Sequence, residues 1–224
     1  MRKLFNAIMS GVYISIGAIV YLSIENKIIA SLFFATGILL VLNFYNMLYT
    51  RVVPLSISEK SYSIKDIIIA LLGNILGCII TALAISLTRW VLNIQDNLNT
   101  IINSKLNDTP ISLIIMGGFC GILVAYAVII SKKYNKGSFA QIFYVWLFIS
   151  AFVLVGFDHI VANLFYFSLY AITTEFSINI LYSLLMVLIG NTIGGIIIGL
   201  CHKQKPHTED NNEISNKINI LLNK

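Results

Sequence analysis

The sequence predicts an all-α membrane protein: six transmembrane helices in an inverted repeat of three plus three, with broken second and fifth helices. Three observations support this fold class. Hydrophobic residues make up 58% of the 224-residue chain and charged residues only 11%, whereas soluble domains carry roughly 25% charged residues. The apolar residues gather into six segments, and crossing a bilayer takes about 20 of them in a row. Polar residues interrupt the second and fifth segments.

The six apolar segments follow one another, separated by connections of different lengths. They comprise residues 4–24, 28–42, 67–87, 111–130, 142–171 and 178–200. Gly11 and Gly17 in the first segment are spaced for close helix packing. A polar stretch, residues 93–110, separates the third segment from the fourth. We expect residues 1–203 to form a single transmembrane domain, followed by a polar tail, 204–224, that is disordered or loosely helical near 218–222.

The fifth segment contains the stretch around which the chain is organised, Gly156-Phe157-Asp158-His159-Ile160-Val161-Ala162-Asn163. Ionisable side chains at membrane depth are costly, and they normally face a bundle interior or a water-filled path. Gly156 predicts a local break, since irregular backbone is tolerated at this depth only where it lines a cavity or is buried in protein. The second segment is interrupted in a similar way by amides, aromatics and a hydroxyl over residues 43–51.

A short motif occurs twice, as Gly73-Asn74-Ile75-Leu76-Gly77 in the third segment and Gly190-Asn191-Thr192-Ile193-Gly194 in the sixth. Taken alone, each copy reads as a small-residue motif for helix packing. Matching positions in two halves, each with a broken helix, indicate instead an inverted repeat whose site lies near the midplane where the breaks meet. The recurrence favours the repeat. Asn74 and Asn191 are candidates to cap or orient the broken helices.

Positive charge is distributed unevenly between the two ends of the predicted bundle. Six spans place both termini on one side, and that side carries ten Lys and Arg residues against three on the other. The ten are Arg2, Lys3, Arg51, Lys60, Lys65, Lys132, Lys133, Lys136, Lys203 and Lys205, and the three are Lys27, Arg89 and Lys105. The positive-inside rule then predicts a protein of the cytoplasmic (inner) membrane with both termini, and the tail, in the cytoplasm.

Several function classes are disfavoured by the residues. The chain has no HExxH or GxSxG motif, so it is not expected to be an enzyme. Cys78, Cys120 and Cys201 are an odd number, widely spaced, and they predict small buried residues, with no metal site, cofactor or disulfide framework. The net charge of +5 is loop charge and predicts no nucleic-acid partner. A purely structural role would not require buried polar groups in broken helices.

Three stretches carry a family likeness. Residues 156–165, GFDHIVANLF, are similar to a G-F-E-H-S-x-A-N-M-F signature, with Asp158 in place of the usual Glu. Residues 190–195 resemble G-N-x-x-G-G, and Leu48-Tyr49-Thr50 resembles L-F-T, with Tyr49 in place of Phe. Together these stretches resemble the formate/nitrite transporter family, and the likeness runs over residues 4–202. Two positions depart from the family pattern: Gly121, where Asn is usual, and Arg51, where small or polar residues are common.

The resemblance implies an aquaporin-like fold assembled as a homopentamer, with a pore for small monovalent anions through each protomer. It also implies three groups of site residues: a substrate pathway, apolar constrictions, and residues at the helix breaks and packing contacts. The pathway comprises His159, Asp158, Asn163, Thr50 and Lys105; the constrictions comprise Phe34, Ile38, Leu48, Tyr49 and Phe152; the break and packing residues are Asn74, Asn191 and Gly156.

These residues suggest a transport mechanism. A bare charge in a low-dielectric constriction costs many kcal/mol, so Lys105 is expected to attract the anion at the outer mouth. His159, which titrates near neutrality in water, is expected to donate a hydrogen bond or exchange a proton with it. Thr50 and Asn163 can donate or accept hydrogen bonds, whereas Asp158 is expected mainly to orient its surroundings.

The substrate and the species that crosses stay open. A small pore lined by Phe and Leu favours formate, nitrite or hydrosulfide over lactate or acetate. Whether the anion or its neutral acid crosses, with or without proton coupling, is not decided by the residues. The alternative is an aquaporin-like channel for small neutral solutes or weak acids, although the chain lacks the paired Asn-Pro-Ala motifs of that class.

Overall fold

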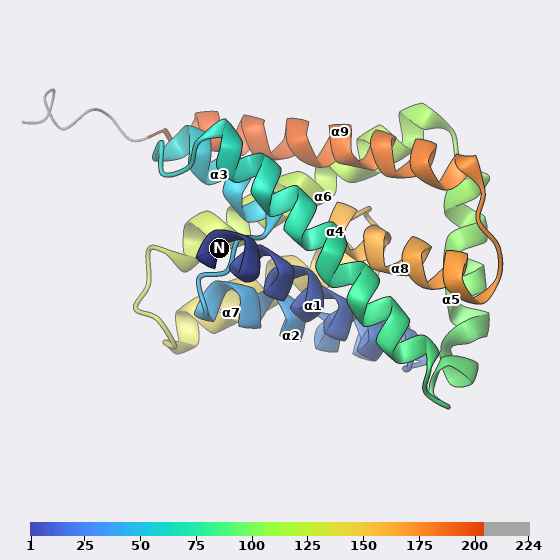
Figure 1. The fold of residues 1–224 in the computed structure, drawn as a ribbon. Helices are drawn as coiled ribbons and strands as arrows, with labels where there is room; N and C mark the ends of the chain where they lie inside the picture. Colours follow the sequence, from blue (N-terminus) through green and yellow to red (C-terminus); the bar gives the residue numbers. More distant parts are fainter. Residues whose placement is uncertain (204–224) are drawn as a thin grey trace, which may run out of the picture.

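A computed structural model describes residues 1–203, and this part of the chain forms nine α-helices and no strand (Figure 1). The helices are α1 (Arg2–Leu22), α2 (Lys27–Asn43), α3 (Tyr49–Ser58), α4 (Ile64–Ser86), α5 (Val91–Leu106), α6 (Pro110–Ser131), α7 (Phe139–Val155), α8 (Ile160–Thr173) and α9 (Ile178–Cys201). The predicted tail, 204–224, lies outside the described residues.

The six predicted apolar segments are confirmed. Four helices, α1, α4, α6 and α9, are each long and apolar enough to cross a membrane. The pair α7 and α8 gives a fifth, broken span that is bent by 50°, and α2 is a shorter apolar helix of 17 residues that α3 continues after a break. The second and fifth segments are therefore the broken ones, as the sequence predicts.

Two tightly crossed helix pairs, α1 with α4 and α6 with α9, form the frame of the two halves. Each crossing depends on glycine because the backbones nearly touch. A Cβ atom on Gly77 would lie 2.1 Å from the Ile8 carbonyl oxygen, and one on Gly194 would lie 2.2 Å from that of Gly118. The repeated motif is thus a packing element at the same place in each half, as small residues allow.

Both breaks contain one residue in the left-handed backbone region. Gly156 ends α7 with φ of +89°, which glycine adopts without a steric penalty. In the other break Tyr45 takes φ of +54°, an uncommon conformation for a residue with a side chain. The chain then leaves the helical path and begins α3 at Tyr49 and α8 at Ile160.

The polar stretch predicted between the third and fourth segments contains a helix that the sequence analysis missed. Residues 91–106 form α5, which lies across one end of the bundle (Figure 1). Ile94, Leu98 and Ile102 recur every four residues, so they share one face, and all three are completely buried. The remaining positions are mostly polar, which hides this narrow stripe in the composition of the stretch.

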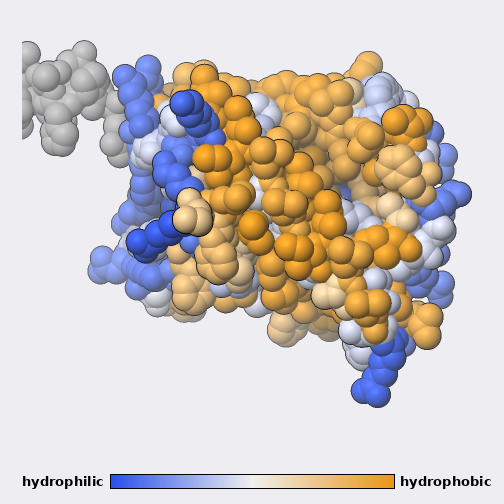
Figure 2. Space-filling model, in the orientation of Figure 1, coloured by the Kyte–Doolittle hydropathy of each residue, from blue (hydrophilic) through white to orange (hydrophobic). Residues whose placement is uncertain are grey.

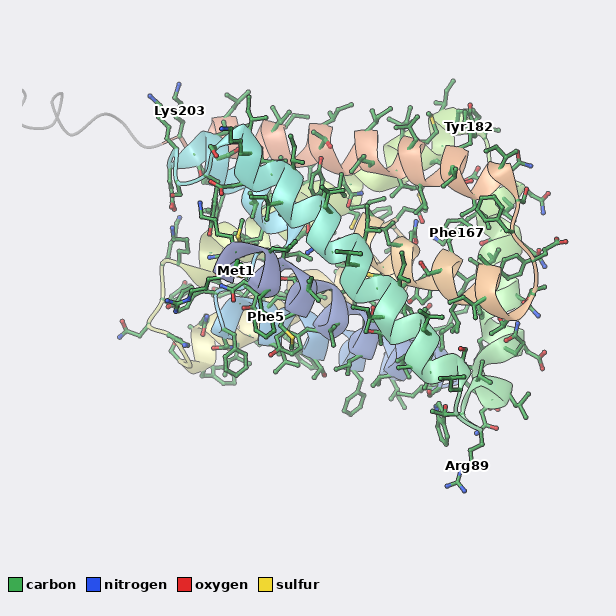
Figure 3. The ribbon with its side chains drawn as sticks, viewed as in Figure 1. Met1, Phe5, Arg89, Phe167, Tyr182 and Lys203 are labelled. Atoms are coloured by element: carbon green, nitrogen blue, oxygen red, sulfur yellow. The ribbon has the colours of Figure 1, made fainter. Side chains whose placement is uncertain are left out.

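The surface agrees with a membrane-spanning bundle. An apolar belt surrounds the middle of the visible face, and hydrophilic residues gather toward its two ends (Figure 2). Large apolar side chains on α4 and α9, such as Ile80 and Leu185, are about half exposed, as expected for residues that face lipid. Met1 and Lys203 lie toward one end of the molecule and Arg89 lies at the other (Figure 3). We call these the terminal end and the α5 end.

Candidate functional site

The two breaks meet at a buried hydrogen bond between Thr50 and His159. The Thr50 hydroxyl oxygen lies 2.9 Å from His159 Nε2, and both residues are at least 97% buried. Thr50 is in the first turn of α3, and His159 is the N-cap of α8. Both half-helices therefore begin at this point and direct the positive ends of their dipoles toward it.

The second ring nitrogen of His159 determines how the imidazole is protonated. Nδ1 accepts a hydrogen bond from the backbone N–H of Ala162 at 3.3 Å, which caps α8. An acceptor nitrogen carries no proton, so the neutral ring holds its proton on Nε2. Nε2 then donates to the Thr50 oxygen, and the hydroxyl proton of Thr50 stays available for another acceptor.

Next to His159, an acid, a base and an amide form a second polar group. Lys105, near the end of α5, makes an ion pair with Asp158. Asn163 donates from Nδ2 to the same Asp158 oxygen at 3.0 Å. Lys105 and Asp158 belong to different segments, and the sequence analysis did not pair them. The charge of Lys105 is therefore compensated by Asp158 and is not free, although its remaining N–H groups can donate.

A cavity of about 140 Å³ leads from the α5 end to His159. Lys105, Asn163 and Gly156 line it beside the imidazole. The rings of Phe34 and Phe152 meet edge to face with centroids 6.0 Å apart, and Phe152 lies 5.9 Å from the His159 ring. The cavity is therefore lined by three of the five predicted pathway residues, Lys105, Asn163 and His159, and by two of the predicted constriction residues. Asp158 and Thr50 do not line it but bond to Lys105 and His159, which do.

The other three predicted constriction residues lie elsewhere. Ile38, Leu48 and Tyr49 are buried, but they do not line this cavity. Leu48 is the N-cap residue of α3, the position that His159 occupies in α8, but its side chain makes no capping hydrogen bond. The Tyr49 hydroxyl donates to Thr192 Oγ1 at 2.7 Å, because Thr192 uses its own proton on a helix carbonyl. Tyr49 thereby ties α3 to α9.

Asn74 and Asn191 hold the two breaks in the same way. Asn74 Oδ1 accepts from the Tyr49 N–H, and its Nδ2 donates to the carbonyls of Met47 and Ala7, at 2.8 to 3.0 Å. Asn191 Oδ1 accepts from the Ile160 N–H at 3.1 Å. Its Nδ2 donates to two further carbonyls, those of Asp158 and Gly117, at 2.7 and 3.0 Å. Each amide therefore satisfies backbone groups that the break leaves unpaired.

The two departures from the family pattern have different surroundings. Gly121 lies at the α6–α9 crossing, where a Cβ would come within 2.5 Å of the Asn191 carbonyl oxygen. Glycine at this position therefore serves the close packing of α6 on α9. Arg51, counted above as a loop charge, is 7% exposed and lies inside α3. Its Nη1 donates to the Asn46 carbonyl and the Tyr62 hydroxyl, both at 3.0 Å.

Two cavity-lining tyrosines were missed by the sequence analysis. Tyr166 follows Asn163 by three residues, and helical spacing puts both on one face of α8. Tyr21 packs edge to face on Phe34 with ring centroids 6.3 Å apart. The spacing from Asn163 was a usable signal for Tyr166, whereas Tyr21 reaches the cavity only through the packing of α1 on α2.

The fold and the site define a class: a multi-pass helical membrane protein whose two broken helices meet at a buried polar centre. The profile of the formate/nitrite transporter family matches residues 1–203. The chain therefore belongs to the formate/nitrite transporter family, which comprises channels and transporters and not enzymes.

Individual relatives agree with this assignment. The chain is 29% identical over 150 residues to a formate-nitrite transporter of Plasmodium ovale and 27% identical over 168 residues to that of Plasmodium falciparum. These alignments cover 62% and 67% of this chain but only 48% and 54% of the relatives, so the chain matches about half of their length.

Solved structures confirm the fold. A pentameric formate channel with formate bound superposes with a TM-score of 0.77 at 23% identity, covering 87% of this chain and 92% of that one. An ion channel of the FNT family gives a TM-score of 0.79 at 22% identity, with 90% and 88% covered. The predicted aquaporin-like architecture with broken second and fifth helices is thereby confirmed.

Proposed function

We propose that this protein is a channel for small monovalent anions of the formate, nitrite or hydrosulfide class, with a pore through each protomer of a homopentamer. The observation that carries the proposal is the buried Thr50–His159 pair at the meeting point of two half-helix N-termini, with a cavity leading to it. Membership of a transporter family and the fold of a pentameric formate channel support it. Residues 1–203 form the channel domain in this proposal.

Orientation belongs to the same proposal. We place the protein in the cytoplasmic membrane with the terminal end in the cytoplasm, because Lys and Arg gather there. The α5 end then forms the outer mouth. The tail, 204–224, is assigned to the cytoplasm by the same rule.

The central pair lowers the cost of moving an anion past the aromatic constriction. An unsolvated monovalent anion in an apolar passage is penalised by many kcal/mol, and hydrogen bonds to a charged acceptor are about twice as strong as neutral ones. Thr50 can direct its hydroxyl proton at the anion while its oxygen accepts from His159. The two residues thus act as one donor chain, strengthened by the two helix dipoles.

Lys105, Asp158 and Asn163 form the outer selectivity group in this mechanism. Lys105 offers its remaining N–H groups to an arriving anion, while Asp158 holds the Lys105 ammonium in place and prevents a strong, trapping positive charge. Conduction requires binding that is favourable enough for the ion to arrive and weak enough for it to leave. The cavity of about 140 Å³ suits a small ion with little accompanying water.

One observation favours the second candidate, a channel for neutral weak acids. Because Asp158 compensates Lys105, the outer cavity carries little net charge, so a neutral acid would meet no electrostatic barrier there. In this version the anion takes up a proton near His159 or before it, and the flux follows the concentration of the protonated species.

Flux in proteoliposomes tests the proposal and separates the two candidates. We expect the purified wild-type protein to pass formate, nitrite or hydrosulfide, to exclude glycerol, and to migrate as a pentamer in native mass spectrometry. Flux that tracks the anion concentration from pH 5 to 8 supports anion conduction, whereas flux that tracks the neutral acid supports the second candidate. Glycerol permeation without anion flux would refute both.

A further inference from the structure

A second cationic site lies at the terminal end of the protein, and nothing in the mechanism above uses it. Arg51 is 7% exposed, and a guanidinium remains charged at all physiological pH values. Within residues 1–203 the ion pairs are Lys3–Asp66, Lys105–Asp158 and Lys132–Glu59. Arg51 belongs to none of them, so in the described part of the chain its charge has no carboxylate partner.

The protein contacts of Arg51 use only part of the side chain. All of its hydrogen bonds within residues 1–203 leave from Nη1, to the carbonyls of Tyr45 and Asn46 and to the Tyr62 hydroxyl. These acceptors are neutral and brace the α2–α3 break. Nε and Nη2 donate to no group in that part of the chain, although a guanidinium presents five N–H donors. The fork that suits an anion is therefore still available.

Arg51 is part of the wall of a second cavity. Its volume is about 140 Å³, and it is bounded by the α2–α3 break, the end of α6 and the loop that leads to α7. Arg51, Lys132 and Lys136 line it together with Tyr134 and Gln141, and none of the described residues that line it is an Asp or Glu. Glu59 pairs with Lys132 and Lys136 lies over the Tyr45 ring, and among residues 1–203 no acid pairs with Arg51.

Burying an unpaired charge costs several kcal/mol, and proteins normally compensate such a charge with an opposite one. Neutral carbonyls and a phenol reduce this cost but leave the net charge in place. A small anion in the cavity would remove it, and the available donors suit an oxyanion or a halide. Arg51 also directly follows Thr50 in α3, and Thr50 bonds to His159, so one half-helix carries both the cavity residue and the member of the central pair.

We propose that the Arg51 cavity is an anion-binding site at the terminal mouth of the pore, with Arg51 as its principal ligand and Lys136 as a supporting charge. The proposal rests on the anion-channel function proposed above, which it extends by naming where an anion binds on the far side of His159 from Lys105. The ligand class is a small monovalent anion, whether the transported ion or another of similar size.

Bromide locates such a site without depending on transport. Crystals of the wild-type protein soaked in bromide are expected to show an anomalous peak beside Arg51 that formate displaces. Arg51→Gln keeps an amide donor for the break but removes the charge, so the peak should disappear. Lys133→Gln is the matched control, because it removes one charge from the same loop without lining this cavity, and it should retain the peak.

Flux supplies the second readout. In oriented vesicles, Arg51→Gln is expected to raise the half-saturating formate concentration about tenfold for flux that begins at the terminal end, as loss of one charge-assisted hydrogen bond implies. Flux that begins at the α5 end should keep its half-saturating concentration. Should Arg51→Gln fail to assemble, Lys136→Gln, which leaves the brace intact, is expected to shift the same parameter by about threefold.

Each result decides the matter. No bromide in the wild-type cavity, or a peak that persists in Arg51→Gln as an adventitious ion only, overturns the proposal and leaves Arg51 as a brace. A bromide site in a protein that conducts no anion would retain this inference and refute the proposed function. Anion flux with the same half-saturating formate concentration in wild type and Arg51→Gln would support the proposed function and refute this inference.

Discussion

The Lys105–Asp158 pair allows a quantitative test of the outer mouth. Replacing Lys105 by Gln leaves the Asp158 carboxylate, only 3% exposed, uncompensated beside the cavity. An anion at about 7 Å from that charge, with an effective dielectric constant of about 20, would be repelled by roughly 2.4 kcal/mol. This energy corresponds to about a 50-fold loss of formate flux at subsaturating concentration.

The compensating change should reverse this loss. In Lys105→Gln/Asp158→Asn both charges are absent, so flux is expected to return to within about fivefold of wild type. Stopped-flow formate uptake into proteoliposomes measures all the variants, after size-exclusion chromatography has shown that each one assembles. Lys27→Gln is the control, because Lys27 is exposed at the same end, and its flux should change less than about twofold. A double variant as slow as Lys105→Gln would refute the electrostatic reasoning.

Three further predictions follow from the central contacts. Thr50→Val keeps the side-chain shape but removes the hydroxyl that joins His159 to the pore, so formate flux should fall about 10-fold or more. Thr50→Ser keeps the hydroxyl and should retain the flux. Equal flux in both variants would exclude the donor chain. Asn191→Leu removes three buried hydrogen bonds and should lower the unfolding free energy by about 3 kcal/mol. This loss should appear as a reduced melting temperature. The control Asn179→Ala changes an exposed residue and should leave the melting temperature unchanged. Gly121→Ala, with its Cβ 2.5 Å from a carbonyl oxygen, should yield less assembled protein than Gly118→Ala, whose nearest neighbour is at 3.9 Å; equal yields would contradict the tight crossing.

Much of the fold could be predicted from the sequence because it depends on local composition. Apolar length sets the spans, and Gly156 marks a break because glycine tolerates positive φ. The repeated motif placed Asn74 and Asn191 at equivalent positions, and their hydrogen bonds show why an amide suits both. An amide both donates and accepts, as an interrupted helix requires.

The rest depended on contacts between distant segments. The pairing of Lys105 with Asp158 joins α5 to the fifth segment, and no local pattern encodes it. The break at Tyr45 has no glycine to mark it. The α5 helix was hidden because three buried residues are enough to anchor it on the bundle. Arg51 looked like a loop charge because its burial follows only from the path of the α2–α3 break.

The two halves of the repeat differ in the residue at the N-cap of the second half-helix. Leu48 and His159 are the N-caps of α3 and α8, each held by an equivalent asparagine. The scaffold is therefore nearly symmetric, while a titratable ring is present on one side only. In our proposal the α7–α8 break supplies the hydrogen-bond donor, His159. The α2–α3 break supplies Thr50, which extends the donor chain into the pore.

The most direct test of the central claim is formate flux through wild type, His159→Ala and His159→Asn from pH 5 to 8. Asn keeps a good N-cap for α8 but has no titratable ring, so it separates capping from proton donation. We expect wild type to pass formate and both variants to differ from it, by about tenfold in rate or in the shape of the pH profile. Wild-type behaviour of His159→Ala at every pH would contradict the claim and reduce His159 to a helix cap.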